Sequence, residues 1–118
     1  MLFTMTENEF IDQLKQNPSS IEFSDSIDVI DQNYHFYAVA FTIGSQDNNA
    51  GENQGSCKLI AFAKHHGLDV EQTLNLFGMY YRDDVLKNPE GDDHQNIRNF
   101  MASGWDGVRF EGDALVRK

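Results

Sequence analysis

Helix start and stop signals constrain this 118-residue chain most strongly, because they divide it into capped amphipathic segments. The first signal is a capping box, in which the Thr6 hydroxyl and the Glu9 carboxylate each bind the other residue's backbone N–H. Pro18 ends this segment, since proline disfavours helical geometry in the residue before it. We therefore expect a first helix from Thr6 to about Asn17.

Four further helices follow from the same kind of signal. Gly67 and Gly104 are expected to end the third and fifth helices as C-caps, and Gly78 predicts a kink or a close contact in the fourth. Apolar side chains at helical spacing predict one shared core that includes Phe62, Phe77, Phe100, Met101 and Trp105. The predicted N-caps are, in chain order, Ser24 (with Ser19 as the alternative), Ser56, Asp69 and Asp92.

Strand patterns occupy the remaining segments. Part of 35–43 is rich in aromatic and β-branched residues and predicts a buried strand, and 108–111 alternates apolar and charged residues as a half-exposed strand does. Directly after the first of these segments, 44–55 is predicted to be a long polar loop. The tail from Gly112 is expected to be loosely held. The chain therefore predicts a single α+β domain over 1–118, with about five helices and two or three short strands.

The charge balance restricts the classes of partner. Nine Lys and Arg residues stand against nineteen Asp and Glu residues, a net charge of −10. This field repels phosphate backbones and anionic lipid, so we expect no nucleic acid and no membrane as partners. A basic protein or a cation fits the charge as a partner, while the alternative is that the charge only maintains solubility. The sequence does not determine the oligomeric state.

Cys57 is the first candidate for catalysis. It is the only cysteine, so no internal disulfide can form, and it falls in the first turn of a predicted helix. Helix N-terminal amides lower the pKa of a thiol and favour the reactive thiolate, and His94 is the candidate base. The alternative is an inert, buried cysteine, because none of the four histidines has a defining spacing from Cys57.

Metal and cofactor motifs are weak or missing in the sequence. It contains no zinc-protease helix motif, no paired cysteine motif and no phosphate-binding or dinucleotide-binding loop, so we expect no cofactor and no metal. Carboxylates do concentrate at 83–84 and 92–93, on either side of a Pro-Gly turn. A weak site for a hard cation is one interpretation, and helix capping with a solvated acidic face is the other.

Polar residues around the long loop and the fifth helix are candidates for a binding surface. The segment 94–99 carries a run of polar side chains on the outward face of a helix. They would form a recognition surface with neighbouring aromatic residues; the alternative is an ordinary surface helix with Trp105 as a core anchor. The predicted binding residues are Asn53, Ser56, Tyr81, Asp84, Asn96, Arg98 and Trp105.

Long motifs along the chain resemble the HopJ family of type III secretion effectors of plant-pathogenic bacteria. The segments that carry this resemblance are 53–58 with 62–63, 77–82 with 85–86, 88–91, 94–101 and 104–112. The resemblance implies a bacterial protein with a type III effector label. It implies no agreed enzymatic activity, cofactor or catalytic residue.

Two functions remain open at this point. The first is a protein-binding effector without enzymatic activity, and the second is a small enzyme that uses Cys57 with a nearby histidine such as His94. Because a capped helix already begins at Thr6 and leaves almost no free leader, we expect the protein to work in the bacterial cytoplasm. Secretion into a host cell by a type III system is the alternative.

Overall fold

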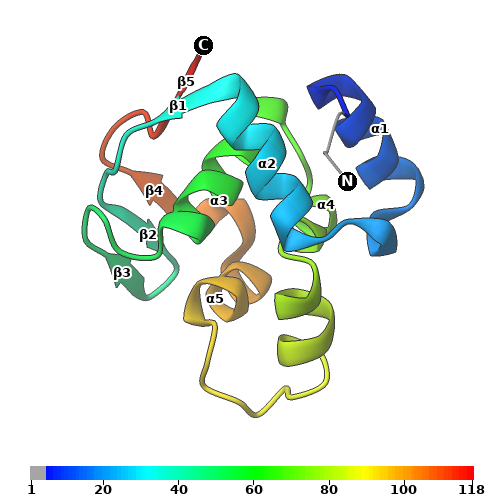
Figure 1. The fold of residues 1–118 in the computed structure, drawn as a ribbon. Coiled ribbons are helices and arrows are strands. Elements are labelled where there is room, and N and C mark those ends of the chain that lie inside the picture. The colour runs from blue at the N-terminus through cyan, green and yellow to red at the C-terminus, as the bar shows by residue number, and fades with distance from the viewer. Residues whose placement is uncertain (1–4) are drawn as a thin grey trace.

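Helix α3 (Gln54–His66) lies at the centre of the structure, a computed structural model that describes residues 5–118 (Figure 1). Its buried residues include neighbours in the sequence, such as Leu59 with Ile60 and Phe62 with Ala63, so more than one side of the helix is covered. A helix that is apolar on several sides must be surrounded by other elements. The rest of the chain provides this cover.

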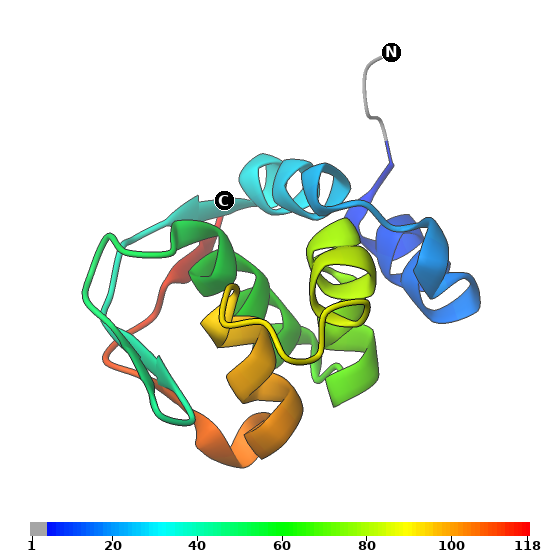
Figure 2. The ribbon, with the colours of Figure 1, turned by 90° about the horizontal axis from the view of Figure 1, so that it is seen from below.

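The other helices pack around α3 from different directions (Figure 2). Phe62 of α3 makes an edge-to-face contact with Phe10 of the first helix at a centroid distance of 6.2 Å. No helix in the described part of the chain is long and apolar enough to cross a bilayer. The bounds are α1 (Glu7–Gln16), η1 (Pro18–Ser20), α2 (Phe23–Asn33), α4 (Val70–Asn75), the π-helical η2 (Tyr80–Val85), α5 (Gln95–Ser103) and η3 (Gly104–Gly107).

Two small antiparallel sheets complete the cover. In the three-stranded sheet, β2 lies between β3 and β4, and Phe41 stacks on its cross-strand partner Phe110 at a centroid distance of 5.6 Å. In the two-stranded sheet, β1 pairs with β5. The α+β class predicted from the sequence is therefore confirmed. The bounds are β1 (Tyr34–Phe36), β2 (Phe41–Ile43), β3 (Gln46–Asn48), β4 (Val108–Phe110) and β5 (Leu115–Arg117).

The predicted core forms, with one exception. Phe62, Phe77 and Phe100 are buried in one cluster, and Trp105 packs against it with its ring edge-to-face on Phe100. Met101 was expected in this core, but its side chain is 40% exposed. The sequence pattern misplaced it because Phe100 and Ile97 already fill the inward face of α5, which leaves Met101 on the outer side.

The first two helix caps show one success and one error. Thr6 and Glu9 form the predicted capping box of α1. Helix α2 was predicted to begin after Ser24, but its N-cap is Glu22, whose backbone N–H donates to the Asp25 carboxylate. The alternative cap at Ser19 lies in the separate turn η1. A glutamate cap escapes sequence rules because serine, threonine, aspartate and asparagine are the usual residues there.

Helices α3 and α5 also begin at unexpected residues. Ser56 and Asp92 were the predicted caps, but the N-caps are Asn53 and His94, both in the left-handed backbone conformation. Neither cap residue binds the first turn of its helix through its side chain. Capping rules search for a side-chain acceptor, so they cannot identify starts of this kind. The caps at Asp69 and the ends at Gly67 and Gly104 agree with the predictions.

The prediction that part of 35–43 is a buried strand is confirmed, since β2 lies within it and Phe41 and Ile43 are buried; the end of β1 also falls in this segment and belongs to the other sheet. Two other predictions need correction. The predicted loop 44–55 contains β3 and the first two residues of α3. The tail from Gly112 is not loosely held, because Ala114 is buried and β5 pairs with β1. Strands β3 and β5 exist through cross-strand pairing, which the pattern of a single strand does not contain.

The carboxylate of Glu7 joins the two ends of the described chain. The Tyr34 hydroxyl donates to it at 2.5 Å, His66 Nε2 lies 2.5 Å away, and Arg117 donates at 2.8 Å. Burial would raise the pKa of Glu7, but hydrogen bonds from Arg117, Tyr34 and His66 and the charge of Arg117 outweigh it and lower that pKa to about 2. Helix α1 is thereby tied to β1, α3 and β5.

We predict that Glu7→Gln lowers the free energy of unfolding by about 2–3 kcal/mol at pH 7, since a lowered pKa of a buried carboxylate is a stability term. The pKa is about 2 in the folded state against an ordinary 4.5. The stabilisation is therefore complete above about pH 4.5 and is lost as the pH falls towards 2. Urea denaturation should show the difference from wild type more than halved at pH 3. The exposed control Glu90→Gln should show almost no difference at either pH, and equal stabilities of Glu7→Gln and wild type at pH 7 would contradict the prediction.

Gly78, in the turn between α4 and η2, allows the chain to pass close to the start of α2. Its φ is +59°, and a Cβ built on it would lie 2.7 Å from the backbone nitrogen of Phe23. The close contact expected there is present, whereas α4 already ends at Asn75, so Gly78 lies in the turn that follows it. The chain then continues into η2, whose Tyr81 and Val85 are buried.

Gly67→Ala is a matched control for the contact at Gly78, because Gly67 has a φ of +64° and open space within 4 Å of the added carbon. We expect Gly67→Ala to cost about 1–2 kcal/mol from backbone strain alone. Gly78→Ala should cost at least about 1 kcal/mol more, because the backbone of α2 must move. Thermal and urea unfolding of both variants measure the difference, and equal losses would refute the close approach.

Candidate binding cleft

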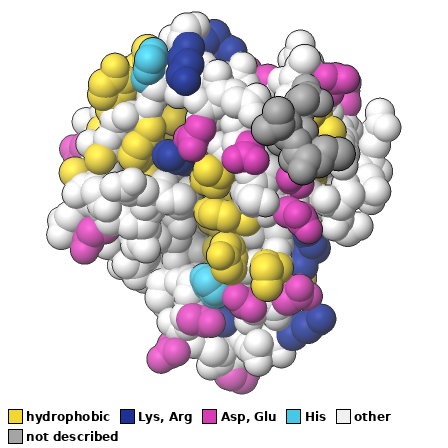
Figure 3. Space-filling model, viewed as in Figure 1, with side chains coloured by type: hydrophobic (Ala, Val, Ile, Leu, Met, Phe, Trp, Pro, Cys, Tyr) yellow, Lys and Arg dark blue, Asp and Glu magenta, His cyan; other side chains and the backbone are white. Residues whose placement is uncertain are grey.

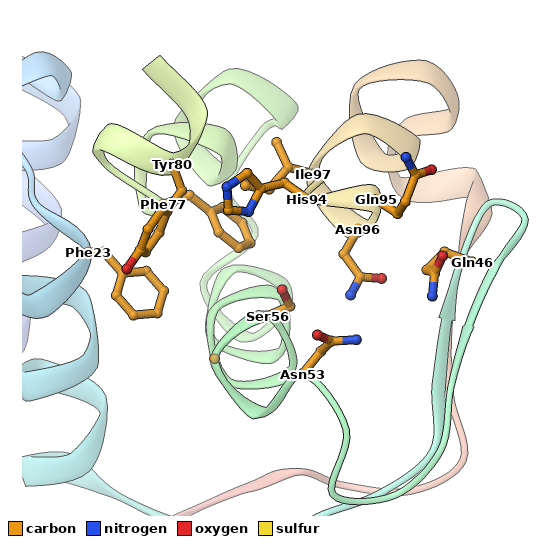
Figure 4. Close-up of a pocket in the computed structure, with 11 residues that line it drawn as sticks. Phe23, Gln46, Asn53, Ser56, Phe77, Tyr80, His94, Gln95, Asn96 and Ile97 are labelled. Atoms are coloured by element: carbon orange, nitrogen blue, oxygen red, sulfur yellow. The ribbon is translucent and has the colours of Figure 1, made fainter. Parts of the chain in front are cut away.

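A cleft of about 390 Å³ opens where α2, α3, η2, α5 and β3 meet (Figure 4). One wall of the cleft is aromatic and another carries amide side chains. The N-termini of α3 and α5, the two helices with left-handed caps, also line the cleft. The lining residues are Phe23, Gln46, Asn53, Gly55, Ser56, Phe77, Tyr80, His94, Gln95, Asn96 and Ile97.

The starts of α3 and α5 define this cleft. Within residues 5–118, Asn53 and His94 are the two non-glycine residues with positive φ, at 49° and 51°. Because neither helix has a side-chain cap, the N–H groups of both first turns lack the acceptor that a capping side chain supplies. Strained backbone of this kind concentrates at functional sites in proteins. The two strained residues therefore mark the cleft as the candidate site.

Three asparagines form the amide wall. Asn48 and Asn96 exchange two hydrogen bonds, at 2.9 and 3.0 Å, and Asn53 donates to Asn48 at 2.7 Å. Asn48 and Asn96 are buried, whereas Asn53 is exposed. The network fixes the positions of β3, α3 and α5 relative to one another, because each residue comes from or caps a different element.

The aromatic wall is formed by Phe23, Tyr80 and His94. Tyr80 packs edge-to-face on Phe23 at 5.1 Å and against the His94 ring at 5.3 Å between centroids. Gly55 permits this arrangement, since a Cβ there would lie 2.8 Å from the Phe23 ring. Tyr80 is 37% exposed, so its ring remains accessible to a ligand.

The carboxylate of Asp84 orients His94 at the edge of the cleft. His94 Nε2 lies 3.0 Å from Asp84 Oδ2 and 3.9 Å from Asp93 Oδ2. Asp93 is held by Arg98, whose Nη2 lies 2.6 Å from it, and this contact chiefly lowers the pKa of Asp93. The acidic turn thus forms ion pairs within the protein. Among residues 5–118, no group of three or more His, Cys, Asp or Glu side chains has the arrangement of a metal site.

Cys57 lies in the core rather than in the cleft. Its side chain is buried, and burial raises the pKa of its thiol, opposed by a hydrogen bond with the Val39 backbone. This corrects the expectation that the helix start favours the thiolate. In the described residues, no histidine or carboxylate forms a hydrogen bond with Cys57, and His94 binds Asp84 instead. The adjacent Ser56 is the residue that lines the cleft with His94.

The structure brings some of the predicted binding residues together and separates others. Asn53, Ser56 and Asn96 line the cleft, and Asp84 reaches it through His94. The remaining three lie elsewhere in the fold. Arg98 binds carbonyl groups of the 88–93 turn, Tyr81 is buried, and the Trp105 indole donates to the Leu68 carbonyl.

Sequence reasoning missed Phe23, Gln46, Asn48 and Tyr80. Phe23 and Tyr80 lie at helical spacing among other apolar residues, and such a stripe does not show which of its members stays at the surface. Gln46 and Asn48 were placed in a loop because β3 carries no apolar residue. Three consecutive polar residues give no strand signal, so only the pairing with β2 identifies this strand.

Comparisons with known proteins give one family model and one similar solved structure. A family model described as "HopJ type III effector protein" matches residues 7–115. A crystal structure described as that of the "unknown function protein VPA0580" is 49% identical in sequence, with a TM-score of 0.95 and 100% of both chains covered. None of the curated proteins compared with this chain is significantly similar to it.

We predict that the Cys57 thiol is unreactive in the folded protein. Buried thiols with a raised pKa react slowly with alkylating reagents, because the thiolate is the nucleophile. Iodoacetamide should modify native protein at pH 8 at least about tenfold more slowly than free cysteine, and urea should restore the ordinary rate. Modification of the native protein as fast as free cysteine would instead support the cysteine enzyme.

Proposed function

The chain belongs to the HopJ type III effector family, and on this basis we propose that it acts by binding a segment of another protein in the cleft between α3, α5 and η2. The carrying observation is the combination of a strained, uncapped helix start on each side with a network of amide side chains between them. No separate catalytic step is part of this proposal.

The chemistry of the cleft suits a peptide main chain. Each Asn or Gln side chain offers both donors and an acceptor, as a peptide group does. Asn53, Gln46 and Gln95 line the cleft, and because each NH2 group makes one hydrogen bond within the protein, its second N–H is left for a ligand. The first-turn N–H groups of α3 and α5 add donors for carbonyl oxygens. Tyr80 and Phe23 provide an apolar surface beside these polar groups for one side chain of the bound segment.

The alternative, a cysteine enzyme, has less support from the geometry. A nucleophile and its base must come within hydrogen-bond reach, and Cys57 is buried without such a partner among the described residues. Ser56 and His94 share the cleft, but the hydrogen bond of His94 goes to Asp84. The hydrogen bonds of the cleft therefore position its walls and do not pair a nucleophile with a base, which favours a binding function.

Selection from a displayed random-peptide library on the full chain tests the proposal. We expect enriched peptides to bind the wild type and to lose at least about tenfold in affinity with Ser56→Phe, because a ring at this position fills the cleft. Ala102→Phe, which adds the same ring at an exposed position of α5, is the control and should bind as the wild type does. Circular dichroism and melting curves confirm that both variants fold.

Two results of that selection would count against the proposal. One is a library that yields no binding peptide. The other is a set of peptides that bind the Ser56→Phe variant and the wild type equally well, since they would use a different surface.

A further inference from the structure

An apolar stripe continues from the cleft across the neighbouring surface (Figure 3). Met79 is 56% exposed and Tyr80 37%, and Phe23 and Ile27 of α2 are half-buried beside the core. Phe23 and Tyr80 line both the cleft and an adjoining hollow of about 650 Å³. The two hollows therefore share a wall and form one surface on which an extended segment can lie.

Carboxylates flank this stripe. Glu22 and Asp83 line the adjoining hollow. Asp84 lies at the edge of the cleft, where its carboxylate is hydrogen-bonded to the lining residue His94. Figure 3 shows acidic side chains on both sides of the apolar stripe. Apolar residues bordered by one sign of charge are typical of a surface that selects its partner by charge.

The cations near this surface offset only part of its negative charge. Arg82 also lines the adjoining hollow, and its guanidinium donates to the neutral carbonyl oxygens of Pro18, Ile21 and Asn75, which hold the side chain in place but do not cancel its charge. Lys87 pairs with Asp83 at 3.0 Å with both side chains largely exposed. Exposed pairs of this kind contribute little, so a cation of a partner can replace Lys87.

We propose that the segment bound in the cleft is basic and carries one large apolar side chain. The apolar side chain would pack against Tyr80, Phe23 and Met79. Lysine or arginine residues on either side of it would pair with Glu22, Asp83 and Asp84. This inference rests on the proposed function and adds the chemistry of the partner to it.

The charge of the whole chain supports the same partner. With a net charge of −10, the protein attracts a basic segment at long range and repels an acidic one. An acidic segment with the same apolar residue would meet carboxylates on both sides of the stripe. The uncapped helix starts line the cleft, and their N–H groups suit main-chain carbonyl oxygens rather than the basic side chains.

Three synthetic peptides test the proposal by titration calorimetry with the full chain. The first has a phenylalanine between two runs of lysine and arginine, the second has the same phenylalanine between runs of glutamate and aspartate, and the third replaces the phenylalanine of the first with glycine. We expect the first peptide to bind at least about tenfold more tightly than either other peptide. Its affinity should fall as salt is raised from 50 to 300 mM.

Protein variants locate the contacts. Tyr80→Ala should weaken binding of the first peptide about tenfold, and Asp83→Asn about threefold with a smaller salt dependence. Asp106→Asn removes an equal charge from an exposed position outside the lining of these hollows and should change the affinity less than Asp83→Asn does. Equal effects of Asp83→Asn and Asp106→Asn would show that only net charge matters and would overturn the inference.

The outcome for the basic segment can be separated from that for the cleft. If library peptides lose affinity with Ser56→Phe but are not enriched in basic residues, the cleft binds peptides and the inferred chemistry is wrong. If neither the library nor the basic peptide binds, both the inference and the proposed function fail.

Discussion

The structure depends on covering helix α3 on several sides at once. Its buried residues cannot be shielded by a single neighbour, so helices from both halves of the chain and strand β5 must reach it. Phe62 shows the arrangement well, since it contacts Phe10 of α1 and Tyr34 of β1 edge-to-face. The segments that close around α3 are short, and short helices are marginal alone, so the fold forms as a unit.

The Glu7 cluster follows from that requirement. Covering α3 brings α1 and β5 together from opposite ends of the chain, and a buried carboxylate at their junction needs compensation. Tyr34, His66 and Arg117 provide three donors, which leave the carboxylate ionised at neutral pH. The ion pair between Glu7 and Arg117 thereby fixes α1 and β5 against each other as part of the fold.

The cleft arises where the cover of α3 is incomplete. At its N-terminal end, the junction of α3 with α5 and η2 contains Asn53, His94 and the Asn48–Asn96 pair beside the apolar side chains. A shared architecture with a protein that is 49% identical shows that the whole fold, including this junction of elements, is common to both chains. The acidic surface around the junction then links the composition of the chain to one kind of partner, a basic segment, under the function proposed above.

The sequence by itself determined the α+β class, the α1 and α4 caps, the ends at Gly67 and Gly104, the aromatic core and the family, because these depend on neighbours along the chain or on long motifs. It also identified Asn53, Ser56 and Asn96 as candidates. Only the tertiary structure decided that Cys57 is buried while Ser56 is accessible, that Tyr80 rather than Tyr81 faces the cleft, and that β3 and β5 exist. Those outcomes depend on which segments pack against one another, and left-handed caps, strand pairing and burial arise from contacts between residues distant in sequence.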